Sequence, residues 1–215
     1  MVAMGMNLER INEITENLQK EIRSNFDEPE AIVRGEDVDA LGGNALSAAD
    51  TDKVIAALNE VPNGVQSWSQ DIPGLVQTSL NLGIMHLDST LDMTFAVRSS
   101  LNTEKEALLQ QLRNVAAKYE GNYTQRGEYP AWEYKKDSGL RDTMVSAYEK
   151  LYGEKPQVVA IHAGLECGLL GEKLPGLDCV SFGPLMQDIH PSREKLNIAS
   201  TERTWNYLLE VLKAL

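Results

Sequence analysis

A histidine between two turn signals is the first residue of this sequence whose type suggests chemistry. His190 lies in "FGPLMQDIHPSRE", residues 182–194, with Gly183-Pro184 before it and Pro191 directly after it. Gly and Pro at these positions favour a loop. The chain contains only three histidines, and a neutral imidazole is a good metal ligand. Two interpretations of His190 are open at this point: it is a metal ligand, or it is a surface imidazole without a function.

A second stretch, "HAGLECG" at residues 162–168, carries His162 and Glu166 directly after the apolar run "QVVAI". We expect "QVVAIHAG" (157–164) and "GLDCVSFGP" (176–184) to form short buried strands of a parallel sheet. Ligands gather at the carboxyl ends of such strands. The loops that carry His162 and His190 are therefore predicted to lie side by side at one sheet edge. Taken singly, His162 and Glu166 also suit a structural, hydrogen-bonded role.

Amphipathic segments predict the helices that position these loops. Ser47, Thr103 and Ser138 are expected to cap three of them, and Gly121-Asn122 and Gly153 to end two. The predicted helices are residues 7–23, 47–61, 103–122, 138–153 and a last one from about Ser200, which is expected to bury Trp205, Leu208, Leu209, Val211 and Leu212. Trp132 and Trp205 are interpreted as core residues.

Alternating and β-branched residues predict two antiparallel strands, 75–88 and 91–100, with the turn "DSTLD" between them. A short third strand is expected near Tyr123. With the flanking helices these strands predict an α/β sandwich that has one sheet face covered, followed by a segment that alternates helix and strand. Residues 25–45 are assigned to a mostly exposed connection.

The composition excludes several classes of protein. The formal charge is −12, with 20 basic against 32 acidic residues, so we expect no nucleic-acid partner. No apolar run approaches the roughly 20 residues that cross a bilayer, and the first residues do not resemble a secretory signal. The sequence therefore predicts a soluble, cytoplasmic protein with no membrane contact. Cys167 and Cys179 lack CxxC spacing and are expected to be reduced, packed thiols.

Several short blocks, in one order, carry a resemblance to a known family. The chain resembles the aminoacyl-histidine dipeptidases (Xaa-His dipeptidases), cytosolic members of a di-metal peptidase superfamily. The resemblance covers residues 1–215 and corresponds to the C-terminal part of that family's chain. It implies an α/β fold in which residues 1–127 belong to a lid domain with an antiparallel sheet, lacking its first part, and residues 128–215 to the C-terminal part of the catalytic domain. The blocks are "PNGVQSWSQDIPGLVQTSLNLG", "VRSS", "YPAWEY", "IHAGLECG", "GLDCVSFGP", "HPSREKLNI" and "ERTWNYLLEVLKAL".

The resemblance implies hydrolysis of unblocked dipeptides, including those ending in histidine, at a site of two zinc ions. His190 matches the family's terminal metal-binding histidine, and Asp188 or Glu194 is expected to orient its second ring nitrogen. The family's other ligands, and the Glu-Glu pair that supplies its general base, cannot be placed in this sequence. We therefore expect weak or no zinc binding, no catalytic base and no activity from this chain alone, as in a truncation, a fragment of a longer gene product or one piece of a split enzyme.

Other residues acquire roles from the same resemblance. Arg98 matches a lid arginine that meets the substrate's terminal carboxylate, with a surface arginine paired to an acid as the alternative. Asn81 and Gly183 are expected beside the substrate, although Asn81 equally suits a strand edge. His162, Glu166 and Glu194 are expected to support the residues that contact the substrate or the metal, without contacting either directly. His86 is given a structural role.

The competing function is a non-catalytic lid that binds a partner or forms a homodimer. A carboxypeptidase-like or deacylase relative fits "HAGLECG" and "FGP" less well.

Overall fold

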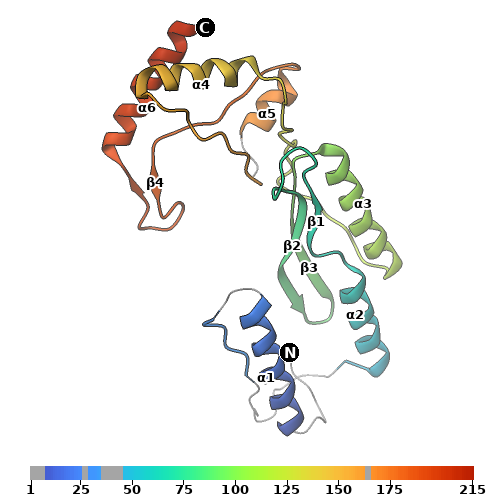
Figure 1. Ribbon diagram of the computed structural model, residues 1–215. Coiled ribbons are helices and arrows are strands. Elements are labelled where there is room, and N and C mark those ends of the chain that lie inside the picture. Colours follow the sequence, from blue (N-terminus) through green and yellow to red (C-terminus); the bar gives the residue numbers. More distant parts are fainter. Residues whose placement is uncertain (1–7, 26–28, 35–45, 163–165) are drawn as a thin grey trace. The chain divides into compact units, whose positions relative to one another are not determined.

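The computed structural model describes residues 8–25, 29–34, 46–162 and 166–215 (Figure 1). The chain divides into two compact units, Met1–Lys53 and Val54–Leu215. No helix in the described ranges combines the length and apolar character that crossing a membrane requires. The elements, in order, are α1 (Leu8–Asn25), α2 (Ala48–Glu60), β1 (Gly64–Trp68), β2 (Val76–Leu87), β3 (Leu91–Ser99), α3 (Asn102–Lys118), α4 (Gly139–Tyr152), α5 (Glu166–Lys173), β4 (Met186–Gln187), β5 (Lys195–Leu196) and α6 (Ile198–Ala214).

The first unit contains the predicted amphipathic helix as α1. Ile14 and Leu18, on its apolar stripe, remain 44% and 45% exposed. The described residues after α1 bind back to it, because the Val33 amide donates to Gln19 Oε1 at 3.0 Å. Of the predicted 25–45 connection, residues 29–34 contain neither helix nor strand, and residues 26–28 and 35–45 lie outside the described residues. α2 begins as predicted, with Ser47 Oγ accepting from the Asp50 amide at 3.1 Å.

The second unit starts with a three-stranded antiparallel sheet in the order β1-β2-β3. The two predicted strands are confirmed as β2 and β3. Along β3, half-buried and exposed residues alternate strictly, which is the pattern of a sheet with one covered face. The sequence did not predict β1, whose pairing with β2 is interrupted by register shifts on either side of Ser67, so that it lacks a clear two-residue period.

Helix α3 covers one face of this sheet (Figure 1). Leu80 of β2, which is only 2% exposed, packs against Leu108 and Leu112 of α3. Phe95 and Val97 of β3 join this core from the neighbouring strand. The predicted antiparallel sandwich with one covered face is therefore the observed arrangement.

A carboxylate in the first turn of α3 fastens the helix to the sheet. Glu104 accepts from Ser67 Oγ on β1 at 2.5 Å, from Gln77 Nε2 on β2 at 2.5 Å, and from Thr78 Oγ1. The Ser67 and Thr78 hydroxyls hold the pKa of Glu104 below its ordinary value, against the opposing effect of burial. Because Gln77 and Thr78 are themselves buried, this cluster satisfies polar groups that would otherwise be costly.

The ends of α3 differ from the prediction. The N-cap residue is Leu101, which makes no side-chain capping bond, so the expected Thr103 cap is wrong. At the other end Glu120 adopts a left-handed φ of 59°, and the Gly121 amide reaches Ala116 O at 2.7 Å. The strand expected near Tyr123 is also wrong: Tyr123 lies in coil and packs its ring against the sheet core instead.

A separate core joins α4 and α6 (Figure 1). Met144 and Ala147 of α4 are buried against Tyr207 and Val211 of α6, and the Tyr207 hydroxyl donates to Met144 O at 2.8 Å. Both predicted ends of α4 are confirmed. Ser138 Oγ accepts from the Arg141 amide, and Gly153 adopts the left-handed conformation with φ 72°.

Helix α6 exposes part of the face that was expected to be buried. It starts at Ile198, where Asn197 provides the cap, and buries Val211 as predicted. However, Trp205 and Leu212 are 59% and 61% exposed, so Trp205 is not a core residue in this structure. Leu209 is 38% exposed, Leu208 is half-buried, and Trp132 is half-buried in the segment before α4.

The two strands predicted after residue 156 do not form. Residues 157–162 and 176–184 belong to no strand, and Val158, Val159 and Ile161 are more than half exposed. Residues 163–164 of the first predicted strand lie outside the described residues. A strand requires a neighbour for its backbone hydrogen bonds, and the described residues place none beside these segments. The predicted parallel sheet is therefore wrong for the described residues. The predicted domain boundary at residue 127 stays a prediction.

Candidate functional site

His190 lies in a loop, as predicted. The structure shows that this loop closes a short hairpin, which the sequence did not predict. The flanking strands β4 and β5 pair Met186 with Leu196 and Gln187 with Lys195. His190 has a left-handed φ of 84° and Asp188 one of 50°, a conformation that Asp and His adopt more readily than most residues. The imidazole is exposed. The loop thus presents His190 at the surface.

The two acids expected to orient the His190 ring make other contacts. Glu194 Oε2 accepts from the backbone amide of His190 at 2.9 Å. Asp188 Oδ2 lies 3.3 Å from Arg193 Nε. These contacts fix the backbone of the loop rather than the ring, and the orienting role of Asp188 or Glu194 stays a prediction.

The donor set around His190 does not make a metal site by itself. Among residues 8–25, 29–34, 46–162 and 166–215, no three or more His, Cys, Asp or Glu side chains are grouped so that they could hold a metal ion. Zinc sites in proteins use three or four protein ligands. The described residues therefore do not fit a zinc site, and His190 would supply at most one ligand of a larger set.

Two predicted residues, Arg98 and His162, lie beside Ser79 on the open face of the sheet. Ser79 Oγ on β2 lies 2.7 Å from His162 Nε2, and Arg98 on β3 is the direct cross-strand neighbour of Ser79. Burial lowers the pKa of His162, and the positive charge of Arg98 lowers it further. Both effects favour the uncharged form of the imidazole. We call Ser79, Arg98 and His162 the open-face cluster.

Sequence reasoning missed Ser79, although a signal for it existed. In β2 the buried Thr78 and Leu80 face α3, so the two-residue period of a strand places Ser79 and Asn81 on the opposite face. Arg98 occupies that same face from β3. Alternation alone could therefore have grouped Ser79 and Asn81 with Arg98. The contact with His162 could not be predicted this way, because it joins residues 83 positions apart.

The guanidinium of Arg98 is exposed and has no carboxylate partner among the described residues. Asn81 is exposed on the same face, opposite Ala96. The sheet thus offers a cation, an amide and a hydroxyl on one side, which is suitable chemistry for binding an anion. His86, near the end of β2, lies opposite Asp92 and is exposed.

The remaining predicted residues belong to other elements and loops of the chain. Glu166 is the exposed first residue of α5. Gly183 lies in coil before β4, and a Cβ built there would meet no atom within 4 Å. No hydrogen bond or ion pair found between described residues connects Gly183, His190 or Glu194 to the open-face cluster. The roles predicted for Glu166 and Gly183 stay predictions.

Cys167 and Cys179 are both free and half-buried. Burial and the neighbouring Cys179 thiol raise the pKa of Cys167 above its ordinary value. A thiol with a raised pKa is a poor nucleophile at neutral pH. This agrees with the predicted reduced, packed thiols and gives no indication of cysteine catalysis.

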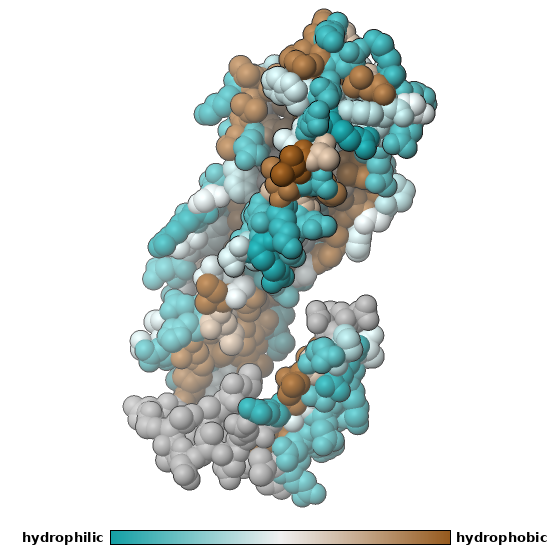
Figure 2. All heavy atoms as spheres, turned by 90° about the vertical axis from the view of Figure 1, so that its left-hand side faces the viewer, coloured by the Kyte–Doolittle hydropathy of each residue, from teal (hydrophilic) through white to brown (hydrophobic). Residues whose placement is uncertain are grey.

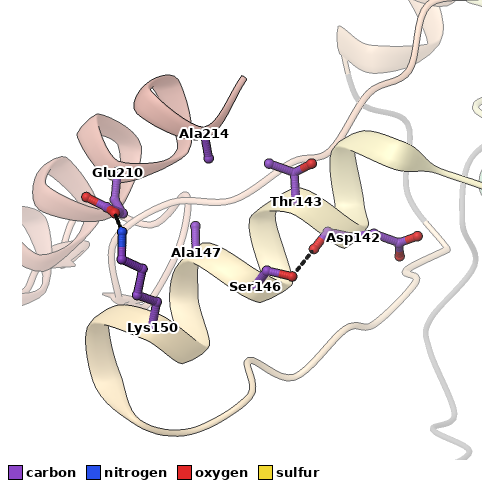
Figure 3. A pocket seen from close by; sticks show the side chains of 7 residues that line it. All are labelled: Asp142, Thr143, Ser146, Ala147, Lys150, Glu210 and Ala214. Carbon is purple, nitrogen blue, oxygen red and sulfur yellow. Dashed lines mark hydrogen bonds and ion pairs between the residues drawn. The ribbon is translucent and has the colours of Figure 1, made fainter.

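A shallow hollow of about 400 Å³ lies between α4 and α6 (Figure 3). Lys150 forms an ion pair with Glu210 across it, and Ser146 donates to the backbone oxygen of Asp142 at 2.9 Å. Lys150, Glu210 and Ser146 are therefore engaged within the hollow. The hollow is a surface groove between two packed helices.

Comparison of the sequence and the fold with known proteins identifies relatives of this chain. No protein-family model matches the chain. The cytosol non-specific dipeptidase of Escherichia coli (strain K12) is 33% identical over 170 residues, which cover 79% of this chain and 35% of that protein. The aminoacylhistidine dipeptidase of Vibrio alginolyticus has the same fold over 94% of this chain and 41% of its own, with a TM-score of 0.81 and 33% identity. The chain is a homologue of these dipeptidases.

The homology is partial in length. The chain spans between about a third and two fifths of the dipeptidases it matches, which is consistent with a C-terminal portion of them. The aminopeptidase PepT of Bacillus cereus ATCC 10987, with a TM-score of 0.61 at 17% identity over 76% of this chain, shares the fold alone. The resemblance and the mixed helix and antiparallel-sheet fold predicted from the sequence are confirmed.

Proposed function

We propose that this chain is the C-terminal part of a metal-dependent dipeptidase that cleaves Xaa-His and related unblocked dipeptides in the cytosol. The observation that carries the proposal is the 33% identity combined with a TM-score of 0.81 to an aminoacylhistidine dipeptidase over almost the whole chain. The open-face cluster supports it independently, because it is suitable for binding one end of a dipeptide.

In this proposal Arg98 binds the substrate's terminal carboxylate. A guanidinium offers two parallel N–H donors that match a carboxylate, and Arg98 is exposed and unpaired among the described residues. Burial and Arg98 lower the pKa of His162, which favours its uncharged form, so the positive charge offered to the carboxylate on this face comes from Arg98. The Asn81 amide lies on the same face and adds a second donor for the substrate.

His190 contributes one metal ligand in the same proposal. The described residues alone do not fit a zinc site, so the other ligands and the general base must come from residues outside those described. This chain by itself is therefore expected to hydrolyse no dipeptide. A metal ligand rather than a surface imidazole explains why a histidine is held at the tip of a hairpin whose backbone is fixed by Glu194.

The direct test is to assay the purified 215-residue chain with alanyl-histidine, with and without zinc, and to measure bound zinc by elemental analysis. We expect no turnover and less than one tightly bound zinc per chain. Turnover by the chain alone, or a stoichiometry of two zinc ions, would contradict the proposal that the site is shared with other residues.

A non-catalytic dimerisation module is the second candidate, and the sheet gives it one specific observation. β1 is an edge strand on which Val65 and Trp68 are 46% and 53% exposed. Exposed apolar edge strands pair with other chains. Analytical ultracentrifugation of the wild type and of Val65→Lys tests this candidate, which requires a dimer that the substitution dissociates.

A further inference from the structure

The two cysteines of the chain are in contact with each other. Cys167 lies in the first turn of α5, and Cys179 lies in the coil that follows this helix. The Cys179 side chain is a hydrogen-bonding neighbour of the Cys167 thiol. A disulfide joins only cysteines whose side chains approach closely, so this contact prepares the two sulfur atoms for a covalent bond.

Close backbone packing holds Cys167 in place. The next residue, Gly168, is buried, and a Cβ built on it would lie 2.6 Å from Pro130 O and 3.4 Å from the Ala131 carbonyl carbon. No side chain larger than a hydrogen atom fits there unless the backbone shifts. The first turn of α5 is therefore seated directly on residues 130–131, and Cys167 has a defined position.

Cys179 is held by the residues on either side of it. Asp178 accepts from Ser138 Oγ at 2.8 Å and from the Leu140 amide at 3.1 Å. Val180 packs against the core that α4 and α6 share. Because both thiols are carried by anchored backbone, a reaction between them has the advantage of proximity over a reaction with a separate molecule.

Small molecules in solution can reach this pair. Both cysteines are half-buried rather than buried, and Leu169 and Leu170, which follow on α5, are 44% and 49% exposed. Hydrophobic side chains also reach the surface in several places on the face that Figure 2 presents. The described residues therefore leave the outer side of α5 open to solvent.

We propose that Cys167 and Cys179 form a redox modification site, at which a low-molecular-weight disulfide such as glutathione disulfide oxidises the two thiols to an intramolecular disulfide. The thiolate of one cysteine attacks a sulfur of the small disulfide, and one small thiol leaves. The thiolate of the other cysteine then attacks the protein sulfur of this mixed disulfide and expels the second small thiol. The chain loses two protons and two electrons, which the small disulfide takes up. The inference does not rest on the proposed function.

The bond ties the start of α5 to the 176–184 segment. It closes a loop over residues 167–179, and a cross-link of this kind restricts the unfolded chain, so the oxidised protein should unfold at a higher urea concentration. Burial, and then the Cys179 thiol, raise the pKa of Cys167. Because only thiolates attack, the exchange is slow at neutral pH, and an excess of the small disulfide speeds it.

The test incubates the full 215-residue chain with excess glutathione disulfide and follows it by mass spectrometry, first intact and then after proteolysis without reduction. We expect a product that is lighter than the reduced chain by two hydrogen atoms, in which the peptides that contain Cys167 and Cys179 stay linked. Dithiothreitol should restore the original mass. The midpoint of urea unfolding should be higher for the oxidised chain than for the reduced chain.

A variant of unchanged composition separates contact in the fold from nearness in the sequence. Cys179→Ser combined with Ser181→Cys keeps two thiols but moves one of them to an exposed position in the same coil. We expect this variant to form the bond about tenfold more slowly or worse and to accumulate mixed disulfides with glutathione. Cys179→Ser alone should stop at one mixed disulfide. All three proteins should give the same circular dichroism spectrum.

The outcomes that overturn the modification site are equally distinct. If the wild type carries only mixed disulfides with glutathione, the two thiols do not meet. If it stays unmodified when folded but reacts in urea, the fold closes the thiols to the oxidant. Equal rates for the wild type and the transposed variant would assign the bond to chain flexibility, and a lower urea midpoint after oxidation would show that the bond distorts the fold.

Discussion

The sheet of residues 64–99 and the segment 157–185 contain similar apolar, β-branched sequences but have different structures. In the sheet, each strand finds its neighbour within a short hairpin, and α3 follows directly to cover one face. In the later segment the same kind of residue is exposed and no described strand lies beside it. The contrast teaches that a strand-forming sequence becomes a strand only where its partner is present.

The largest expected effect on the free energy of unfolding comes from a substitution in the core of the sheet. Leu80→Ala removes a side chain that is 2% exposed and should lower the free energy of unfolding by about 2–5 kcal/mol. Ile161→Ala, at 57% exposure, should change it by less than about 0.5 kcal/mol. Urea unfolding followed by circular dichroism measures both. Equal losses would show that the later segment is packed as tightly as the sheet.

The Glu104 cluster predicts the next largest effect, with a defined pH dependence. Glu104→Gln removes the charge that accepts from Ser67 and Thr78 and should cost about 1–3 kcal/mol at pH 7. Because folding lowers the pKa of Glu104, its contribution is present above the ordinary glutamate pKa of about 4.3 and is lost as the pH falls through the lower folded value.

Stability measured from pH 7 to pH 2 tests the sign of this effect. The difference between the wild type and Glu104→Gln should shrink as the medium becomes acid. Glu106→Gln, an exposed neighbour on the same helix, should show no comparable difference. If the difference in the free energy of unfolding between the wild type and Glu104→Gln stays constant with pH, the charge of Glu104 is not what stabilises the sheet.

A smaller effect concerns a carboxylate of the 176–184 segment that is hydrogen-bonded to the start of α4. Asp178 accepts from Ser138 Oγ at 2.8 Å and from the Leu140 amide at 3.1 Å at the start of α4. Burial alone would raise the pKa of Asp178, but the Leu140 amide and the Ser138 hydroxyl lower it overall. Asp178→Asn should cost about 1 kcal/mol in urea unfolding, whereas Asp137→Asn, at an exposed residue, should cost almost nothing. An unchanged midpoint for Asp178→Asn would show that the anchor is dispensable.

The smallest effect is a titration shift in the open-face cluster. Burial and the positive charge of Arg98 both lower the pKa of His162. Arg98→Gln removes the second effect, so the pKa of His162 should rise. Because the chain has only three histidines, nuclear magnetic resonance can follow each of them. A His162 titration that is unaffected by the substitution would separate Arg98 from the imidazole.

What the sequence could predict depends on the range of the interactions. The caps at Ser47, Ser138 and Gly153, and the hairpin of β2 and β3, follow from residues close together in the chain and were predicted correctly. The cap predicted at Thr103 was wrong because α3 begins one residue earlier, at Asn102. The neighbouring Glu104 binds side chains of the sheet. The strand near Tyr123 failed because the tyrosine ring packs on the sheet while its backbone stays in coil.

The candidate site was harder to predict than the fold. The loop position of His190 could be read from Gly183, Pro184 and Pro191. By contrast, the contact between Ser79 and His162 depends on packing between distant segments, which no local pattern encodes. Trp205 shows the opposite error: an apolar residue at helical spacing was interpreted as core, although helical spacing cannot say which of two apolar stripes has a partner.

The bulge at Gly83 determines which side chains the tip of the β2–β3 hairpin displays. The register shifts there, between Leu82 and Ile84, and absorbs one extra residue, so Met85 and Leu87 stay on the same side as Leu82 while Ile84 and His86 stay on the other. Shortening the chain by Gly83 alone would restore an unbroken alternation and leave every outward and inward assignment as it is. A residue added within a regularly paired part of either strand would instead reverse the alternation up to the tip.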